Sequence, residues 1–142
     1  MAYLGLFLKR LGFKKVITIG IAAYFLRYAI FGTTMLPVWI MVLSQAFHGF
    51  CYAFFFAAAY IYVDKMADED VRHSAQTVFG IIILGGGPVI GGWLSGYLQN
   101  MYTVENVFSF SNFWYTMSAI GLVTMISFFM LFQEQLSDGD SE

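Results

Sequence analysis

One cationic side chain, Arg27, lies inside a long apolar stretch of the sequence. A charge in the hydrocarbon of a membrane is costly, so such a residue usually has a partner or a function. All nine Asp and Glu residues lie in polar links or in the C-terminal tail, so none is an evident partner. Two interpretations stay open: Arg27 pairs with a helix outside this chain, or its side chain extends to the nearby membrane surface.

A second apolar stretch carries three polar residues, Gln45, His48 and Tyr52, at spacings of three and four. On a helix this spacing places them on one face. Their side chains can form hydrogen bonds with a sugar or a base, and Tyr52, Phe55 and Phe56 can stack on a nucleobase. The alternative is hydrogen bonding between helices and aromatic contact with lipid. For His48 alone this alternative is favoured, whereas a polar face on an apolar span suggests a water-filled path.

The third apolar stretch is rich in glycine. Two pairs, Gly87 with Gly91 and Gly92 with Gly96, have the spacing that lets membrane helices approach closely. A phosphate-binding loop would need a preceding strand and usually a lysine, and neither is present. We therefore predict close helix packing on this face, with a kink at Pro88.

Several functional classes lack support in the sequence. No nucleophile lies near a base, no carboxylate pair lies in a span, and no set of metal ligands is present, so we expect no enzyme, no cofactor and no metal site. One cysteine, Cys51, allows no disulfide within the chain. No basic arm suggests binding to nucleic acid.

Four apolar stretches must position these residues, and their composition predicts membrane-spanning helices. The chain has 142 residues, 59% hydrophobic and 11% charged, whereas a soluble domain is about a quarter charged. Backbone groups in lipid must pair within a helix. The predicted spans are at about residues 16–34, 37–63, 75–98 and 110–132. We expect residues 1–15 to be the end of a preceding helix plus a basic loop, and residues 133–142 an acidic tail.

The distribution of basic residues predicts the orientation. Six of the seven Lys and Arg residues precede the first span or lie between the second and third. Because basic loops stay in the cytoplasm, we expect both termini to be cytoplasmic, in the cell (inner) membrane.

Four segments resemble the nucleoside–proton symporter family of the major facilitator superfamily. They are residues 26–28 (LRY), 47–56 (FHGFCYAFFF), 61–64 (IYVD) and 71–76 (VRHSAQ). Residues 5–15 (GLFLKRLGFKK) also resemble the cytoplasmic loop signature of that superfamily, although the usual acidic residue is absent.

The resemblance implies an all-α membrane protein with a partial major-facilitator fold, corresponding to helices nine to twelve of twelve. The second span would then line the substrate cavity, and the third would contact the other half of the transporter. Residues at the cytoplasmic ends of the helices become candidates for a gate: Lys9, Arg10, Asp64 and Arg72. Relatives often have Asp where this chain has Ala53, which places proton coupling at His48 or on other helices.

We therefore expect part of a secondary transporter that moves nucleosides or similar small polar solutes, with protons as the candidate coupling ion. The alternative is a four-helix membrane scaffold or accessory protein without transport activity. The expected partners are the lipid bilayer and the solute, with no nucleic acid.

Overall fold

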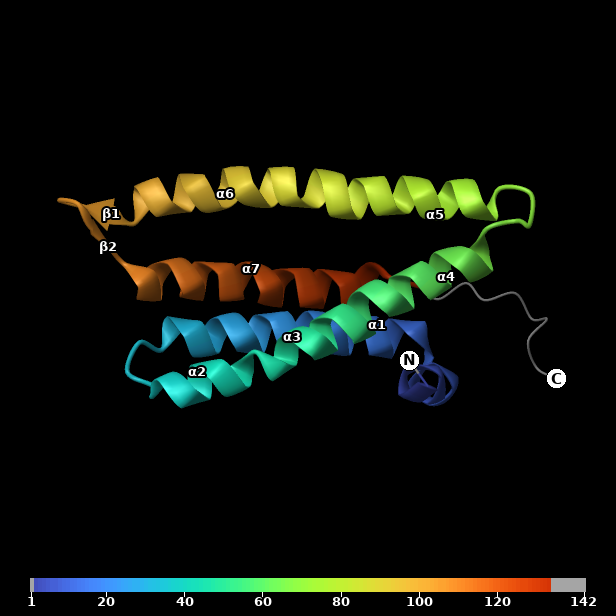
Figure 1. Ribbon diagram of the computed structural model, residues 1–142, viewed down its shortest axis with the longest axis horizontal. Helices are drawn as coiled ribbons and strands as arrows, with labels where there is room; N and C mark the ends of the chain where they lie inside the picture. The colour runs from blue at the N-terminus through green and yellow to red at the C-terminus, as the bar shows by residue number, and fades with distance from the viewer. Residues whose placement is uncertain (1, 134–142) are drawn as a thin grey trace.

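The computed structural model describes residues 2–133, and in this part of the chain it confirms an all-α membrane architecture. Four helical stretches are long and apolar enough to cross a membrane: Leu4–Gly32, Val38–Met66, Arg72–Met101 and Phe110–Leu131. They run alternately up and down along one long axis (Figure 1). The predicted tail lies almost entirely outside the described residues. The first three spans extend beyond the predicted limits, because polar residues at their ends continue the helix where the hydrophobic stretch has stopped.

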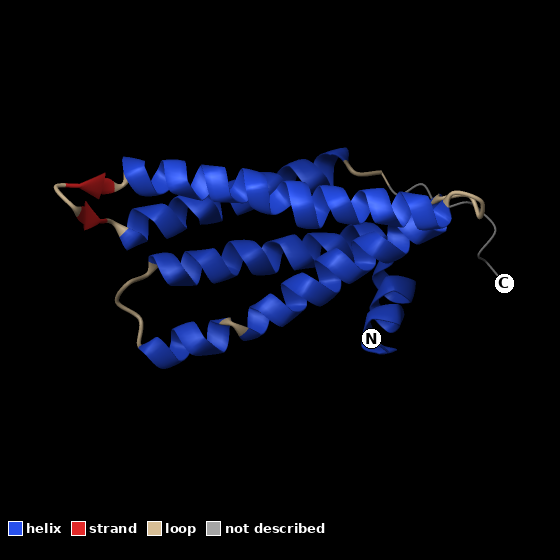
Figure 2. Ribbon diagram, turned by 45° about the horizontal axis from the view of Figure 1, so that its top comes forward, coloured by secondary structure: helices blue, strands red, loops and turns tan. Residues whose placement is uncertain are grey.

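The first span belongs to α1 (Ala2–Gly32), which has a sharp bend at Gly12. Gly12 has φ 77° and ψ 167°, a left-handed conformation that glycine adopts at low cost. The part of α1 before Gly12 turns across the direction of the spans (Figures 1 and 2). The expected basic loop is therefore shorter than predicted, with Lys9 and Arg10 in the helix before the bend and Lys14 in the helix after it.

The second span is helical throughout but irregular. It comprises α2 (Val38–Ser44), α3 (Ala46–Phe50), the π-helix η1 (Cys51–Ala57) and α4 (Ala58–Met66). At the α2–α3 junction the turns are tight, because the Gln45 amide donates to Val42 O and the His48 amide to Gln45 O. Directly afterwards the wider π-helix begins. Such π segments are rare and occur often at functional sites.

The third span has the same kind of interruption. It runs through α5 (Arg72–Gly80), the π-helix η2 (Ile81–Gly86) and α6 (Gly87–Met101). Pro88 has no amide hydrogen, and its ring crowds the carbonyl four residues earlier, which lies in η2. The widened turn thus lies where Pro88 disturbs the regular hydrogen-bond pattern, and the span runs nearly straight where a kink was predicted (Figure 1).

A short hairpin connects the third and fourth spans, where a polar link was predicted. Strands β1 (Thr103–Val104) and β2 (Val107–Phe108) pair antiparallel. Glu105 and Asn106 between them have φ of 50° and 63°. Two successive positive φ angles are typical of the tight type I′ turn. The chain then enters α7 (Phe110–Leu131).

The core lies where α1 packs against α7 and against the second span. Its buried members are Leu4, Phe13, Val16, Ile17, Ile21 and Ala58. Two hydroxyls fasten α7 to α1, since Ser118 Oγ donates to Phe25 O at 3.1 Å and Ser111 Oγ to Gly32 O at 2.7 Å. The third span stands apart, and none of its most apolar window is buried among the described residues. In Figure 1 it forms the outer layer, held at one end by α4 and at the other by the hairpin.

Candidate functional site

The predicted polar face of the second span is open in this structure. Gln45, His48 and Tyr52 are all exposed, whereas Cys51 next to Tyr52 is fully buried. His48 lies in the short α-helix α3, between the tight turn at Gln45 and the wide turns of the π-helix η1. The polar face therefore runs along three different helical geometries. The sequence spacing gave no sign of the π-helix, because hydrophobic periodicity does not distinguish one widened turn from a regular one.

Three aromatic side chains of this span form a continuous cluster. The ring centroids of Tyr52 and Phe56 are 5.5 Å apart, and those of Phe55 and Phe56 are 5.2 Å apart. These separations are typical of favourable aromatic pairs. Phe55 also lies against α1, where its backbone amide approaches Gly20. Phe55 therefore contributes to helix packing, while the exposed ring of Tyr52 remains available to a ligand.

Arg27 has a partner within the described chain, which corrects one of the two interpretations of the sequence. Its Nη1 lies 3.1 Å from Nδ1 of His48, on the second span. The guanidinium carbon also lies 5.2 Å from the ring centroid of Phe31 and 5.8 Å from that of Tyr28. This partner was not evident in the sequence, because a cation in a membrane is expected to pair with a carboxylate, yet a neutral imidazole nitrogen also accepts a hydrogen bond.

One donor of Arg27 stays unused in this arrangement. Its Nε is buried and has no hydrogen-bond partner among the described residues. A buried polar group without a partner is costly. The Arg27–His48 pair is thus a polar centre between the first two spans that still has the capacity to donate a hydrogen bond.

Asp64 connects the second and third spans at the opposite end of the bundle. Its Oδ1 accepts a hydrogen bond of 2.8 Å from Gln76 Nε2 and lies 3.8 Å from Arg72 Nε. The 3.8 Å between Arg72 and Asp64 is within the range of an ion pair but is too long for a hydrogen bond. Gln76 was not singled out in the sequence. Among the described residues no ion pair joins Lys9 or Arg10 to Asp64, so the four gate candidates do not form one cluster here.

The glycines predicted to pack closely have no close neighbour within this part of the chain. A Cβ atom added at Gly87, Gly91, Gly92 or Gly96 would meet nothing within 4 Å. The close helix crossing lies instead at Gly20, where an added Cβ would be 2.7 Å from the amide nitrogen of Phe55. The sequence did not reveal Gly20, because an isolated glycine has no spacing pattern.

The sequence pattern of a known family decides which protein class this arrangement belongs to. The pattern described as "Nucleoside H+ symporter" matches residues 1–137. This chain belongs to the nucleoside H+ symporter family. The resemblance seen in the sequence is thereby confirmed.

Named relatives agree with this family. The chain is 31% identical over 130 residues to nucleoside permease NupG of Escherichia coli (strain K12), covering 89% of this chain and 31% of that protein. It is 30% identical to the putative nucleoside transporter YegT, covering 93% and 33%, and 28% identical to xanthosine permease, covering 89% and 31%, both from the same organism. The chain thus spans about a third of the length of these relatives.

Solved structures show the same fold. The crystal structure of nucleoside transporter NupG matches with a TM-score of 0.84 and 29% identity, over 94% of this chain and 34% of that chain. A NupG variant in which Asp is replaced by Ala matches with a TM-score of 0.84 and 31% identity, over 92% and 33%. The four helices of this symporter-family chain therefore correspond to about a third of the NupG fold.

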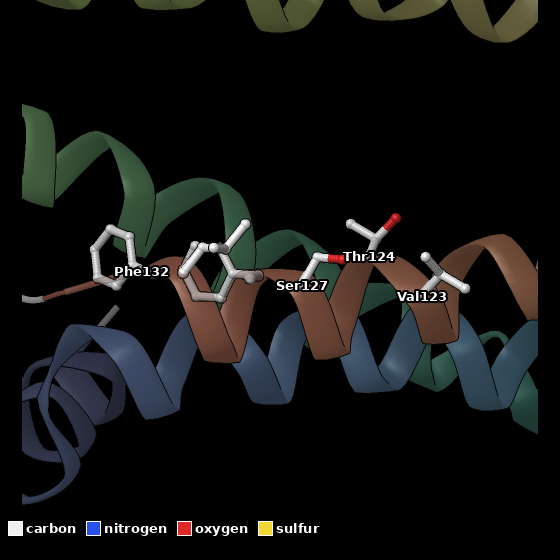
Figure 3. A pocket seen from close by; sticks show the side chains of 6 residues that line it. Val123, Thr124, Ser127 and Phe132 are labelled. Atoms are coloured by element: carbon white, nitrogen blue, oxygen red, sulfur yellow. The ribbon is translucent and has the colours of Figure 1, made fainter.

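Two grooves on the described part of the chain are apolar and open. One, of about 530 Å³, is lined by Phe132, directly after α7, and by five α7 residues: Val123, Thr124, Ser127, Phe128 and Leu131 (Figure 3). The Thr124 hydroxyl already donates to Ile120 O. A second groove lies along α4, α5 and η2. Neither resembles an enclosed polar site, so the residues near Arg27 and His48 remain the better candidates for a solute.

Proposed function

We propose that this chain forms part of the solute pathway of a proton-coupled transporter for nucleosides or similar small polar solutes. Family membership supports transport and does not favour the alternative of a scaffold without transport activity. The names of its relatives, nucleoside permease and xanthosine permease, support nucleosides as the solute class. The proposed orientation has both termini in the cytoplasm, because the basic residues gather on one side.

The observation that carries the proposal is the open polar face of the second span. Gln45, His48 and Tyr52 are exposed in a stretch that is otherwise apolar, and His48 contacts the half-buried Arg27 of the first span. Such residues are expensive in lipid and are expected to face an aqueous cavity. An exposed Tyr52 ring next to Phe56 provides an aromatic surface on which a base can stack.

A chimera tests this proposal directly. The corresponding third of nucleoside permease NupG is replaced by this chain, and uptake of labelled uridine is measured in cells that lack their own nucleoside permeases. We expect saturable uptake above the vector level, competed by unlabelled nucleosides. A chimera that reaches the membrane as a folded, monodisperse protein but neither binds nor transports any nucleoside would contradict the proposal.

A matched pair of variants locates the pathway. In the chimera, Tyr52→Ala should raise the uridine KM, because it removes a surface for stacking worth about 1–3 kcal/mol per base. The control is Tyr97→Ala, which removes another exposed tyrosine, on α6. Equal effects of the two substitutions would mean that Tyr52 has no special contact with the solute.

A further inference from the structure

The hydrogen bond between Arg27 and His48 joins the first span to the second. His48 lies ten residues into the second span from Val38, which is about 15 Å along a helix rising 1.5 Å per residue. This depth is near the middle of a hydrocarbon core about 30 Å thick. His48 thus lies well inside the hydrocarbon, and its hydrogen bond connects it to Arg27, which comes shortly before the end of the first span at Gly32.

The chemistry of the two side chains fixes their protonation. A guanidinium group only donates hydrogen bonds and stays charged in proteins. Nδ1 of His48 must therefore accept, and the imidazole is neutral with its proton on Nε2. A proton added to Nδ1 forms a new N–H bond, turns both ring nitrogens into donors and removes the acceptor. The result is two adjacent cations, because Arg27 keeps its own protons.

Among the titratable groups around the pair, His48 is the one suited to gain a proton near neutral pH. Near Arg27, the first span contributes Tyr24 and Tyr28, and the second contributes Cys51. Tyr52 lies one turn from His48, α2 has no titratable side chain, and α7 places the uncharged Trp114 against Tyr28. Asp64 and Lys65 of α4 lie at the other end of the span (Figure 1). An imidazole is the side chain that ordinarily changes charge between pH 5 and 8.

We propose that the Arg27–His48 hydrogen bond is a proton-sensitive connection between the first two spans, made by neutral His48 and broken when His48 accepts a proton. Breaking it separates the second span from Arg27 at the irregular α2–α3 junction and frees Nη1 beside the already unpaired Nε. The inference rests on the proposed function for its role in transport, where proton binding at His48 would be coupled to movement of the second span.

Nuclear magnetic resonance of the ring nitrogens of the full chain, in lipid nanodiscs, tests the connection without transport. The chain has two histidines, and His73 in the polar link serves as the internal control. At pH 8 we expect His48 to have its proton on Nε2 and an unprotonated Nδ1. At pH 5 both nitrogens should carry protons, and the contact between the Arg27 side chain and His48 should be lost.

A substitution tests whether Arg27 determines which ring nitrogen of neutral His48 carries the proton. Arg27→Met retains a long side chain but removes the donor, so His48 should lose its preference for the Nε2 proton while His73 is unchanged. Loss of the Arg27–His48 contact at low pH and this change of tautomer would support the proposal. Finding the Nδ1–H form at pH 8, or a contact that persists when His48 is charged, would overturn it. The two results that would overturn the proposal are both measured on the wild-type chain, so the test remains decisive even if the Arg27→Met variant fails to fold.

Uptake by the chimera then distinguishes this inference from the proposed function. If the inference is right, His48→Gln should reduce the ratio of uptake at low external pH to uptake at high external pH by at least threefold, whatever its effect on nucleoside affinity. An unchanged pH dependence would remove His48 from proton coupling even if nucleosides are transported. A folded chimera that neither binds nor transports any nucleoside would contradict the proposed function, while the resonance result would still decide whether the proton-sensitive connection exists.

Discussion

Gly20 and Phe55 lie in direct backbone contact where the first span crosses the second. A Cβ atom added at residue 20 would be 2.7 Å from Phe55 N and 2.9 Å from Phe55 Cβ. The neighbour is backbone of the π-helix η1 and cannot rotate away as a side chain would. This contact brings η1 against the buried part of α1, where Val16, Ile17 and Ile21 lie. One glycine thus determines how closely the candidate substrate helix approaches the core.

Substituting this glycine should separate the two spans. We expect Gly20→Ala to reduce the free energy of unfolding by about 1–3 kcal/mol, the usual cost of overpacking. Unfolding in lipid or mild detergent measures the change. Gly91→Ala is the matched control, because a Cβ there meets nothing within 4 Å. A similar loss in both variants would show that the contact at Gly20 is not the cause.

The Arg27–His48 pair should show a measurable coupling energy. A double-mutant cycle with Arg27→Met and His48→Ala compares the free energy of unfolding of the four proteins at pH 8. Hydrogen bonds between membrane helices contribute about 0.6 kcal/mol on average and up to about 1.7, so we expect coupling in this range. Strictly additive effects would mean that the 3.1 Å contact contributes nothing to stability.

Asp64 should stabilise the fold more through its hydrogen bond with Gln76 than through its charge. Asp64→Asn keeps an oxygen acceptor for Gln76 but loses the attraction to Arg72, whose side chain is 37% exposed. Ion pairs that are partly exposed contribute about 0–1 kcal/mol, so we expect a small effect of this variant. Asp64→Ala loses both interactions and should destabilise the chain more. Equal destabilisation by the two substitutions would assign the effect to charge.

The basic residues predict which links face outwards. Cysteines placed at Thr33 and Thr103 should react with a thiol reagent that does not cross membranes, when it is added to intact cells. Native Cys51 is fully buried and gives a low background. Labelling at either site only after the cells are opened would disprove the proposed orientation.

The open face of the second span should be reached by water in the assembled chimera. Cysteines at Gln45, His48 and Tyr52 are expected to react with small water-soluble thiol reagents, and nucleoside should slow the reaction. A cysteine at Ala58, which is fully buried, is the control. If all three positions are as inert as residue 58, the polar face serves helix packing.

The sequence by itself determined the number of spans and the family. Long apolar stretches and a shortage of charge are sufficient for four membrane helices, because unpaired backbone cannot lie in lipid. Short motifs along the chain, such as residues 47–56, indicated the family that the comparison confirmed. These features depend on local composition and on residue order, which are readable without coordinates.

Only the tertiary structure decided which residues meet. Arg27 and His48 are 21 positions apart, and their contact requires two antiparallel helices in one particular rotation. The same holds for Gly20 against Phe55, whereas the more conspicuous glycines of the third span lie open. The π-helices were also hidden, since widening one turn costs little and leaves hydrophobicity unchanged. Periodicity describes one helix at a time, while contacts depend on how neighbouring helices are placed around it.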